Sequence, residues 1–380
     1  MTAADRAIFR EEHHLFRETC RRFMEREVAP HHAQWEEDGQ VSREVWLKAG
    51  QTGLLLPTTS AEYGGGGGDF PYAAVLIEEI SRVNGTGLGF GLHNDIVAPY
   101  IETYGSEDLK RHWLPKMAAG TTIGAICMTE PGTGSDLQGV KTTAVRDGNH
   151  YVVSGQKTFI TNGQMADLYI VVVKTDPAKG AKGTSLILVE GDRPGFTRGR
   201  KLKKLGLKAQ DTSELFFDQV RVPATNLLGD ENQGFRYLME QLPRERLLSA
   251  IRAAAAAEMA VEWTVNYTRA REAFGQKIFE FQNTQFKLAE MKTQAVIGRV
   301  FVDHCIQQLG AGKLDLPTAA IAKLWMSEMQ GRVVDEGVQL HGGYGYMWEF
   351  PITQLYADSR IQRIFAGTSE IMKLIIARSL

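Results

Sequence analysis

Apolar residues recur at helical spacing through the first third of the chain, from Ala4 to about Thr122. The spacing is clearest at Phe9, Leu15, Phe16 and Phe23, and again at Val75, Leu76, Glu79 and Ile80. This pattern predicts a mostly helical region. It is interrupted by Gly64–Gly68, five consecutive glycines that are too flexible for any regular element, so we expect a loop there.

From about Ile123 to Asn232 the pattern changes to short runs of β-forming residues. The runs are Ile123–Met128, Tyr151–Ile160, Leu168–Lys174, Ser185–Val189 and Leu215–Val222. Asp147-Gly148 predicts a hairpin between Thr142–Arg146 and Tyr151–Ser154, and Asn162-Gly163 predicts a second turn. We therefore expect the middle of the chain to form an antiparallel β domain.

Helical spacing returns after Gly234 and continues to the C-terminus. The predicted helices are Pro243–Glu272, Gln282–Leu309, Pro317–Leu340, Pro351–Ile364 and Thr368–Ala377. Their prolines suit the first helical turn, where a missing N–H costs little. The fold class is thus α+β and multidomain, with an N-terminal α-helical domain at 1–122, a middle antiparallel β domain at 123–232 and a C-terminal four-helix-bundle domain at 233–380.

Composition narrows the possible partners and surroundings. A net charge of -2 gives no general attraction to nucleic acid or to anionic membranes. Three scattered cysteines, Cys20, Cys127 and Cys305, suit a reducing compartment better than a disulfide framework or a metal cluster. Met1–Arg10 lacks the pattern of a signal peptide, and no apolar run approaches membrane-spanning length. We expect a cytoplasmic location without membrane insertion.

Two segments of the β region could hold a flat polar ligand. The chain has no G-x-G-x-x-G, so a Rossmann-type site has no support. Met128–Asp136 combines glycines with the hydroxyls of Thr129 and Ser135, although an ordinary β-turn would look the same. Strand alternation places Phe159 and Thr161 on one face, where they could stack against a heteroaromatic ring or simply belong to core and surface.

Three further segments lie in the helical C-terminal part. Arg271–Gly275 with Gln282, and Gln339–Tyr346, place polar side chains beside glycines, which suits a pyrophosphate or adenine site and equally a capping loop. His341 alone is more often structural than a metal ligand. Glu245, which follows Pro243 at the expected start of a long helix, is a carboxylate that a helix N-terminus favours without any catalytic role.

Taken together and in this order, these motifs closely resemble the acyl-CoA dehydrogenase family. The similarity extends over essentially the whole chain and includes Ala366–Ile371 near its end. Leu137-Gln138-Gly139, Lys208–Thr212, Glu245–Leu248 and Tyr344–Glu349 are most similar to the long-chain branch. The resemblance implies oxidation of the Cα–Cβ bond of a fatty acyl-CoA to a trans-2-enoyl-CoA.

The resemblance also implies FAD between the β domain and the C-terminal helices. The implied contacts of the flavin and ribityl regions are Ile126, Met128, Thr129, Gly134, Ser135, Phe159, Thr161, Thr368 and Glu370. Those that reach the FAD of a neighbouring subunit are Arg271, Phe274, Gln282, Gln339, Gly342 and Gly343. A homotetramer is therefore implied, with acyl-CoA as substrate and an electron-transferring flavoprotein as electron acceptor.

The position of the catalytic base follows from the same resemblance. Many family members carry a glutamate immediately before the Gly-Thr pair near the C-terminus, but this chain has Ala366 there. Members similar to the long-chain and isovaleryl branches place the carboxylate at the position of Glu245. Glu245 would take the α-proton while the β-hydride passes to flavin N5. The implied substrate contacts are Ser135, Pro243, Arg246 and Gly367.

Burial by the bound acyl chain is expected to raise the pKa of Glu245, against the opposing effects of the helix dipole and Arg246. Other functions stay open at this point. They are a short branched-chain dehydrogenase of isovaleryl type, an acyl-CoA oxidase, a flavin-containing DNA-associated protein of the same fold, and a flavin-binding scaffold without catalysis. A DNA-binding role would require a basic patch, for which the charge balance of the C-terminal third gives no support.

Overall fold

The computed structural model describes residues 6–380, and its first third is helical as expected. Ala4, the expected start of this region, and the first half of Met1–Arg10 lie outside the described residues. The N-terminal helices are α1 (Glu11–Phe23), α2 (His32–Asp38), α3 (Arg43–Gln51), α4 (Phe70–Arg82), α5 (Phe90–Leu92), α6 (Ala98–Tyr104) and α7 (Glu107–Ala118). Almost all residues of α4 are buried, which makes it the central helix of this part.

Gly64–Gly68 form the predicted loop, and the structure shows why glycine is needed there. The tract folds back over the segment before it, with the N–H of Gly66 donating to the Leu56 carbonyl and that of Gly67 to the Thr59 carbonyl. A Cβ at Gly65 would lie 2.3 Å from the Thr59 carbonyl oxygen, so a side chain would clash with the backbone. Glycine is thus required by close packing of two backbone segments.

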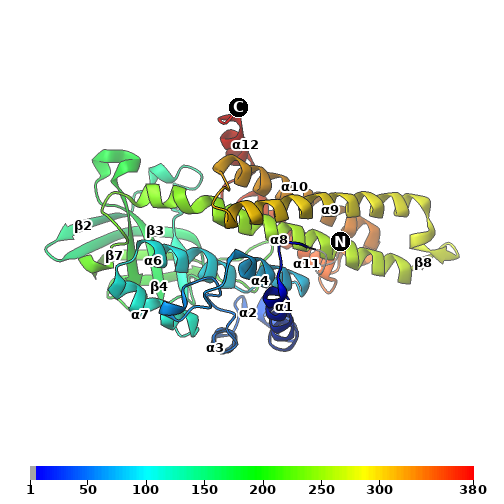
Figure 1. Ribbon diagram of the computed structural model, residues 1–380, viewed down its shortest axis with the longest axis horizontal. Coiled ribbons are helices and arrows are strands. Elements are labelled where there is room, and N and C mark those ends of the chain that lie inside the picture. Colours follow the sequence, from blue (N-terminus) through cyan, green and yellow to red (C-terminus); the bar gives the residue numbers. More distant parts are fainter. Residues whose placement is uncertain (1–5) are drawn as a thin grey trace.

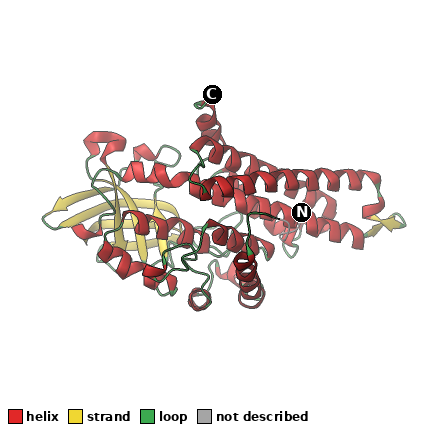
Figure 2. Cartoon of the chain, viewed as in Figure 1, coloured by secondary structure: helices red, strands yellow, loops and turns green. Residues whose placement is uncertain are grey.

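The middle part is a seven-stranded sheet at one end of the molecule (Figures 1 and 2). Its strands are β1 (Gly124–Cys127), β2 (Thr143–Asp147), β3 (His150–Thr161), β4 (Leu168–Lys174), β5 (Thr184–Glu190), β6 (Phe196–Lys201) and β7 (Thr212–Pro223). Most pairs are antiparallel, but β1 runs parallel to β4, and β2 meets β4 in a parallel pair. The expected antiparallel arrangement therefore holds for most pairs, and only the pairs that β1 and β2 form with β4 depart from it.

The predicted hairpin is confirmed, because Asp147 of β2 pairs with His150 of β3 and Gly148 adopts a positive φ of 61° between them. Sequence patterns missed β6, whose only apolar residue is Phe196. Its pairing with β7 supplies the backbone hydrogen bonds, and the Phe196 ring contacts Tyr169 and Phe217 inside the sheet.

The C-terminal part is a bundle of long helices that runs away from the sheet (Figure 1). Its elements are α8 (Gly234–Ala270), β8 (Glu272–Ala273), β9 (Gln276–Lys277), α9 (Gln282–Gly310), α10 (Leu316–His341), α11 (Pro351–Ser359) and α12 (Ser369–Ala377). Pro351 and Pro317 occupy first-turn positions, as predicted. The helix expected to continue to Ile364 ends at Ser359 and is followed by a 3-10 turn.

The predicted start of the longest helix was wrong. α8 begins at Gly234 rather than at Pro243, which lies inside the helix. The additional turns are held by tertiary packing, since Tyr237 and Leu238 are buried and the Tyr237 ring stacks on Tyr104 at 4.0 Å. With 37 residues, α8 is roughly 55 Å long and connects the sheet end of the molecule with the β8–β9 hairpin.

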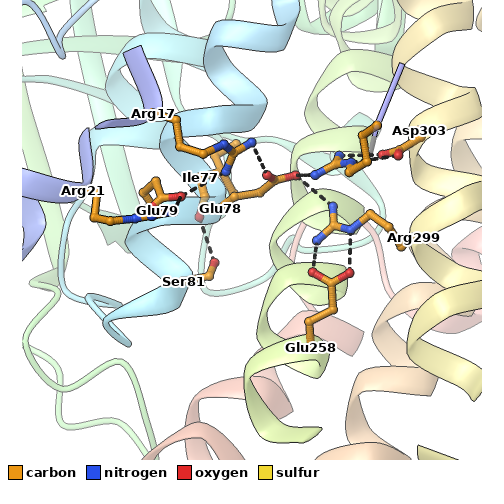
Figure 3. Close-up of polar contacts among 10 residues, drawn as sticks. Arg17, Arg21, Ile77, Glu78, Glu79, Ser81, Glu258, Arg299 and Asp303 are labelled. Carbon is orange, nitrogen blue, oxygen red and sulfur yellow. Dashed lines mark hydrogen bonds and ion pairs between the residues drawn. The ribbon is translucent and has the colours of Figure 1, made fainter. Parts of the chain in front are cut away.

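A buried network of charges joins the N-terminal part to the bundle (Figure 3). Glu78 on α4 receives hydrogen bonds from Arg6, Arg17 and Arg299, at 2.7, 2.7 and 2.9 Å. Burial alone would raise the pKa of Glu78, but these three guanidinium groups lower it to about 2. The carboxylate therefore remains charged and cross-links three segments that are distant in the sequence.

Expectations about the cysteines, about membrane-spanning helices and about His341 can be compared with the described residues. Cys20, Cys127 and Cys305 are all free and buried. Across residues 6–380, no helix is long and apolar enough to cross a membrane. His341 has a packing role, because its Nδ1 lies 2.7 Å from the Gly337 carbonyl and its ring stacks on Tyr267.

Candidate active site

Glu245 lies inside α8, eleven residues after Gly234, and its side chain is buried with 7% exposure. The expectation that it sits at a helix N-terminus was wrong, so the helix dipole has little influence on it. Tyr100 on α6 donates a hydrogen bond of 3.0 Å from its hydroxyl to Oε1 of Glu245. The carboxyl group is thus held between the N-terminal helices and the bundle and does not point into bulk solvent.

Burial dominates the electrostatics of this carboxyl group. It raises the pKa of Glu245 to about 7, while the Tyr100 hydrogen bond and the nearby charge of Arg246 oppose the rise. Desolvation therefore outweighs the opposing effects on the pKa of Glu245 even in the chain without substrate. A carboxylate with a pKa near the working pH is suited to accepting a proton and releasing it again.

Arg246 is buried beside Glu245 and is incompletely paired. Its Nε and Nη1 atoms are buried with no hydrogen-bond partner, and burial lowers its pKa. A Cβ at Gly367 would lie 3.9 Å from Nη2, so the guanidinium faces the loop that precedes α12. The structure thus brings two of the predicted substrate contacts, Arg246 and Gly367, to one place. Unpaired buried N–H groups favour a ligand that brings acceptors.

Lys323 on α10 also contacts the loop that precedes α12. Its Nζ donates a hydrogen bond of 2.6 Å to the Gly367 carbonyl. Burial and the charge of Arg246 lower the pKa of Lys323 to about 8. Ala366 and Gly367 both have positive φ values, 53° and 95°, and this bond helps to hold the turn in which Ala366 keeps a conformation that is unfavourable for alanine.

Sequence motifs missed both Tyr100 and Lys323. Tyr100 belongs to the apolar spacing of the N-terminal helices, and Lys323 is a single lysine within a long helical pattern. A lysine on the otherwise apolar face of a helix was the one available signal, because such a side chain must find an acceptor when the helix packs.

A buried ion pair fixes the loop Met128–Asp136 to the sheet. Lys157 on β3 contacts Glu130 at 2.8 Å, and Glu130 also accepts hydrogen bonds from the N–H groups of Lys141 and Thr142. In the same loop, Ser135 is exposed and Thr129 is half-buried. Cβ atoms at Gly132 and Gly134 would meet open space. Ile126, in β1, is 9% exposed and Met128 is half-buried.

Phe159 and Thr161 lie beside this loop at the end of β3. A register shift between Lys157 and Ile160 interrupts the strand, and Phe159 has a φ of 59°. Ile160 is buried, whereas the Phe159 side chain is 68% exposed and Thr161 is half-buried. Both side chains thus reach the surface, but the interrupted strand leaves the predicted alternation of faces without a test. An exposed aromatic face beside hydroxyl groups and open glycines fits a flat polar ring such as a flavin.

The second group of predicted cofactor residues lies at the other end of the bundle. It consists of Arg271, Phe274, Gln282, Gln339, Gly342 and Gly343, all of which are exposed. Phe274, in the β8–β9 hairpin, is 96% exposed. Arg271 follows Glu245 by 26 residues, which corresponds to roughly 39 Å along α8. One chain therefore cannot bring both groups to the same end of one cofactor.

The last predicted contacts lie at the start of α12. Thr368 caps the helix by accepting a hydrogen bond of 3.3 Å from the Ile371 N–H, and Glu370 is exposed in the first turn. Both line a surface pocket of about 230 Å³ together with Arg360 and Arg363. Thr368, which lines this pocket, directly follows Gly367 in the sequence.

Models of the acyl-CoA dehydrogenase family match consecutive parts of the chain. The model of the N-terminal domain matches residues 10–121, that of the middle domain residues 125–220 and that of the C-terminal domain residues 232–380.

The chain belongs to the acyl-CoA dehydrogenase family. It is therefore an FAD-dependent oxidoreductase, and the predicted α+β fold with helical, β and helical parts is confirmed.

Similar proteins include enzymes with stated substrates. The chain is 53% identical to a mitochondrial long-chain specific acyl-CoA dehydrogenase of Sus scrofa over 99% of its length and 88% of that protein. A crystal structure of an acyl-CoA dehydrogenase from Geobacillus kaustophilus is 53% identical, with a TM-score of 0.96 and 98% of each chain covered. A glutaryl-CoA dehydrogenase from Mycobacterium smegmatis in complex with FADH2 is 30% identical, with a TM-score of 0.92, 98% of this chain and 95% of that chain covered.

Proposed function

We propose that this dehydrogenase oxidises long-chain fatty acyl-CoA to trans-2-enoyl-CoA, with Glu245 as the base that takes the α-proton. The observation that carries the proposal is the buried carboxyl of Glu245, whose pKa is raised to about 7. Ala366 occupies the other position at which the family places its base, and alanine cannot accept a proton. The 53% identity to a long-chain enzyme supports the substrate class.

Each neighbouring side chain has a distinct task in this scheme. Tyr100 orients Glu245 through Oε1, which leaves Oε2 for the substrate proton. Lys323 fixes the loop Ala366–Gly367, so that the following backbone N–H groups, at or next to Glu370, can donate to the thioester carbonyl as charge develops on it. FAD, when bound, supplies the acceptor for the β-hydride through N5.

We assign FAD to the loop Met128–Asp136, Phe159, Thr161 and the start of α12 in one subunit, and to Arg271, Phe274, Gln282, Gln339, Gly342 and Gly343 of a neighbouring subunit. The separation of roughly 39 Å between Glu245 and Arg271 along α8 supports a contribution from two chains. A homotetramer follows as the proposed assembly, and light scattering that gives the mass of a single 42.2 kDa chain would contradict it.

Partners and location form part of the same proposal. An electron-transferring flavoprotein reoxidises the flavin in this scheme. A solved structure described as an electron-transferring flavoprotein contains a chain that is 34% identical to this one. Three free buried cysteines agree with a reducing compartment, so we propose a cytoplasmic location. Recovery of the protein in a periplasmic or membrane fraction would contradict the location, and peroxide as the main product in air would favour an oxidase instead.

An anaerobic titration with acyl-CoA substrates tests the function directly. Saturated acyl-CoAs from butyryl to octadecanoyl are added to the flavin-loaded protein, and the loss of flavin absorbance is followed. We expect bleaching that is strongest for long unbranched chains. Isovaleryl-CoA as the best substrate would support the branched-chain alternative. Absence of bleaching would leave a flavin scaffold, and salt-sensitive binding to DNA would then revive the DNA-associated reading.

The pH dependence of kcat/KM provides a separate test of the base. Glu245 accepts a proton only when it is ionised, and its pKa is about 7. We therefore expect kcat/KM to fall about tenfold per pH unit below pH 7 and to level off above it. The Glu245→Asp variant should retain this form with a changed midpoint, whereas a profile that is flat from about pH 5 to about pH 8 would exclude Glu245 as the base.

A further inference from the structure

A cavity of about 30 Å³ lies where all three parts of the chain meet. α4 and the loop after it, Leu207 of the β region, and helices α8, α10 and α11 contribute to its wall. Its volume is close to the share of one water molecule. Phe365, which directly precedes the loop Ala366–Gly367, lines it as well, so the cavity borders the catalytic region.

Two glutamine side chains in the wall of this cavity lack partners. Gln330 on α10 is 2% exposed and Gln362 is 3% exposed, and both line the cavity. The Oε1 atom of each is buried without a hydrogen-bond partner. Buried amide oxygens are rarely left unpaired, so this pair indicates space for a group that donates a hydrogen bond.

Arg252 supplies a cation at the same cavity. It lies on α8, its half-buried side chain lines the cavity, and Asp95 and Asp358 are close enough for their charges to act on it. Burial lowers the pKa of Arg252, and the two carboxylates raise it, but within residues 6–380 neither forms an ion pair with it. Asp358 instead accepts hydrogen bonds from the Thr86 hydroxyl and the Leu207 N–H. The guanidinium therefore retains donors for another acceptor.

An acyl chain that extends from Glu245 toward the C-terminal end of α8 would lead to this cavity. Arg252 comes seven residues after Glu245, so both project from the same face of α8, separated by about 10 Å along its axis. Leu88, Leu355 and Ile361 add apolar wall to the cavity. We call the group Arg252, Gln330 and Gln362 the distal polar chamber.

The charges around this chamber restrict what it can bind. An alkyl end would leave the two amide oxygens and the guanidinium without partners. A carboxylate would find one cation but would face Asp358 in the cavity wall, and it could not donate to the amide oxygens. A hydroxyl group donates one hydrogen bond and accepts others, which matches an unpaired amide oxygen and a guanidinium N–H.

We propose that the distal polar chamber binds a hydroxyl group at the far end of the acyl chain, so that the enzyme prefers ω-hydroxyacyl-CoA to unsubstituted acyl-CoA of the same length. This inference rests on the proposed function, since it requires the acyl chain to lie with its α-carbon at Glu245. Arg252, Gln330 and Gln362 are specificity residues in this scheme and take no part in the chemical step.

The test compares ω-hydroxyacyl-CoA with unsubstituted acyl-CoA at each even length from decanoyl to hexadecanoyl, using the flavin-loaded enzyme. We expect kcat/KM for the hydroxylated substrate to exceed that for the plain one by about tenfold or more at one chain length. In Arg252→Leu and Gln362→Leu the ratio should fall to about one. Activity with octanoyl-CoA, which is too short to reach the chamber, should be unchanged.

Gln307→Leu, an exposed position on α9, is the matched control and should retain the parent preference. The parent enzyme alone decides the question if a variant does not fold. Equal kcat/KM values for plain and hydroxylated chains at every length would overturn the chamber proposal while leaving the proposed function intact, and the cavity would then hold water only. Failure of every acyl-CoA to bleach the flavin would overturn both.

Discussion

Glu245→Gln is expected to retain the yellow flavin and to lower kcat by about 10²–10⁴-fold, the range that a positioned general base contributes. Glutamine preserves the size of the side chain and can still accept the Tyr100 hydrogen bond at its amide oxygen. It cannot take up the α-proton. Single-turnover bleaching of the flavin by a long-chain acyl-CoA measures the chemical step directly.

Stability separates this loss of chemistry from a loss of fold. The pKa of Glu245 is raised from 4.5 to about 7, so the buried carboxyl binds its proton more tightly in the folded chain than in the unfolded one. Its contribution to folding is therefore most favourable below pH 4.5 and is lost as the pH rises toward 7. Glu245→Gln should melt at the same temperature as the parent or higher at pH 8. Glu262→Gln, exposed on α8, is the control and should keep full activity.

Glu78→Gln is expected to destabilise the folded chain by about 3–5 kcal/mol, because it leaves Arg6, Arg17 and Arg299 buried around a neutral side chain. Removing one partner of a buried ion network exposes the full desolvation cost of the remaining charges. Denaturant unfolding at neutral pH, followed by circular dichroism, would show the loss as a lower midpoint. The native pKa of about 2 predicts that the parent loses the same contribution as the pH falls from 4.5 toward 2.

An exposed ion pair provides the comparison. Glu240→Gln removes the pairing with Arg236 on the surface of α8, where both side chains are about half exposed. We expect a change below about 0.5 kcal/mol, as is usual for such pairs. If Glu78→Gln shifts the midpoint no more than Glu240→Gln, the network contributes little to stability and other contacts hold the two parts of the chain together.

Periodicity predicted the helices well wherever packing agrees with local signals. The predicted helix Pro317–Leu340 is found as Leu316–His341. The start of α8 was missed, because the signal used was a proline, which is tolerated in a first turn and here also within a helix. β6 was missed because hydrogen bonding to β7, rather than its own residues, makes it a strand. Such tertiary effects are absent from local sequence.

The candidate site depends even more on contacts between distant parts of the chain, which the sequence does not reveal. The position of Glu245 came from family resemblance, but its burial and raised pKa depend on Tyr100 and on neighbouring helices that the sequence does not bring together. Lys323 meets Gly367 across 44 residues of sequence. The network around Glu78 joins Arg6 to Arg299. Contacts over such separations arise from folding and leave no pattern that a reader of the linear chain can recognise.

The proline inside α8 has a mechanical consequence. Because Pro243 has no N–H, the carbonyl of Met239 lacks the partner that the regular helix ladder would provide. Bending of a long helix concentrates where such a rung is missing. Any bending of α8 is therefore expected to concentrate in the turn that holds Pro243, two residues before Glu245, so that the two halves of the helix would move about a point next to the catalytic carboxyl.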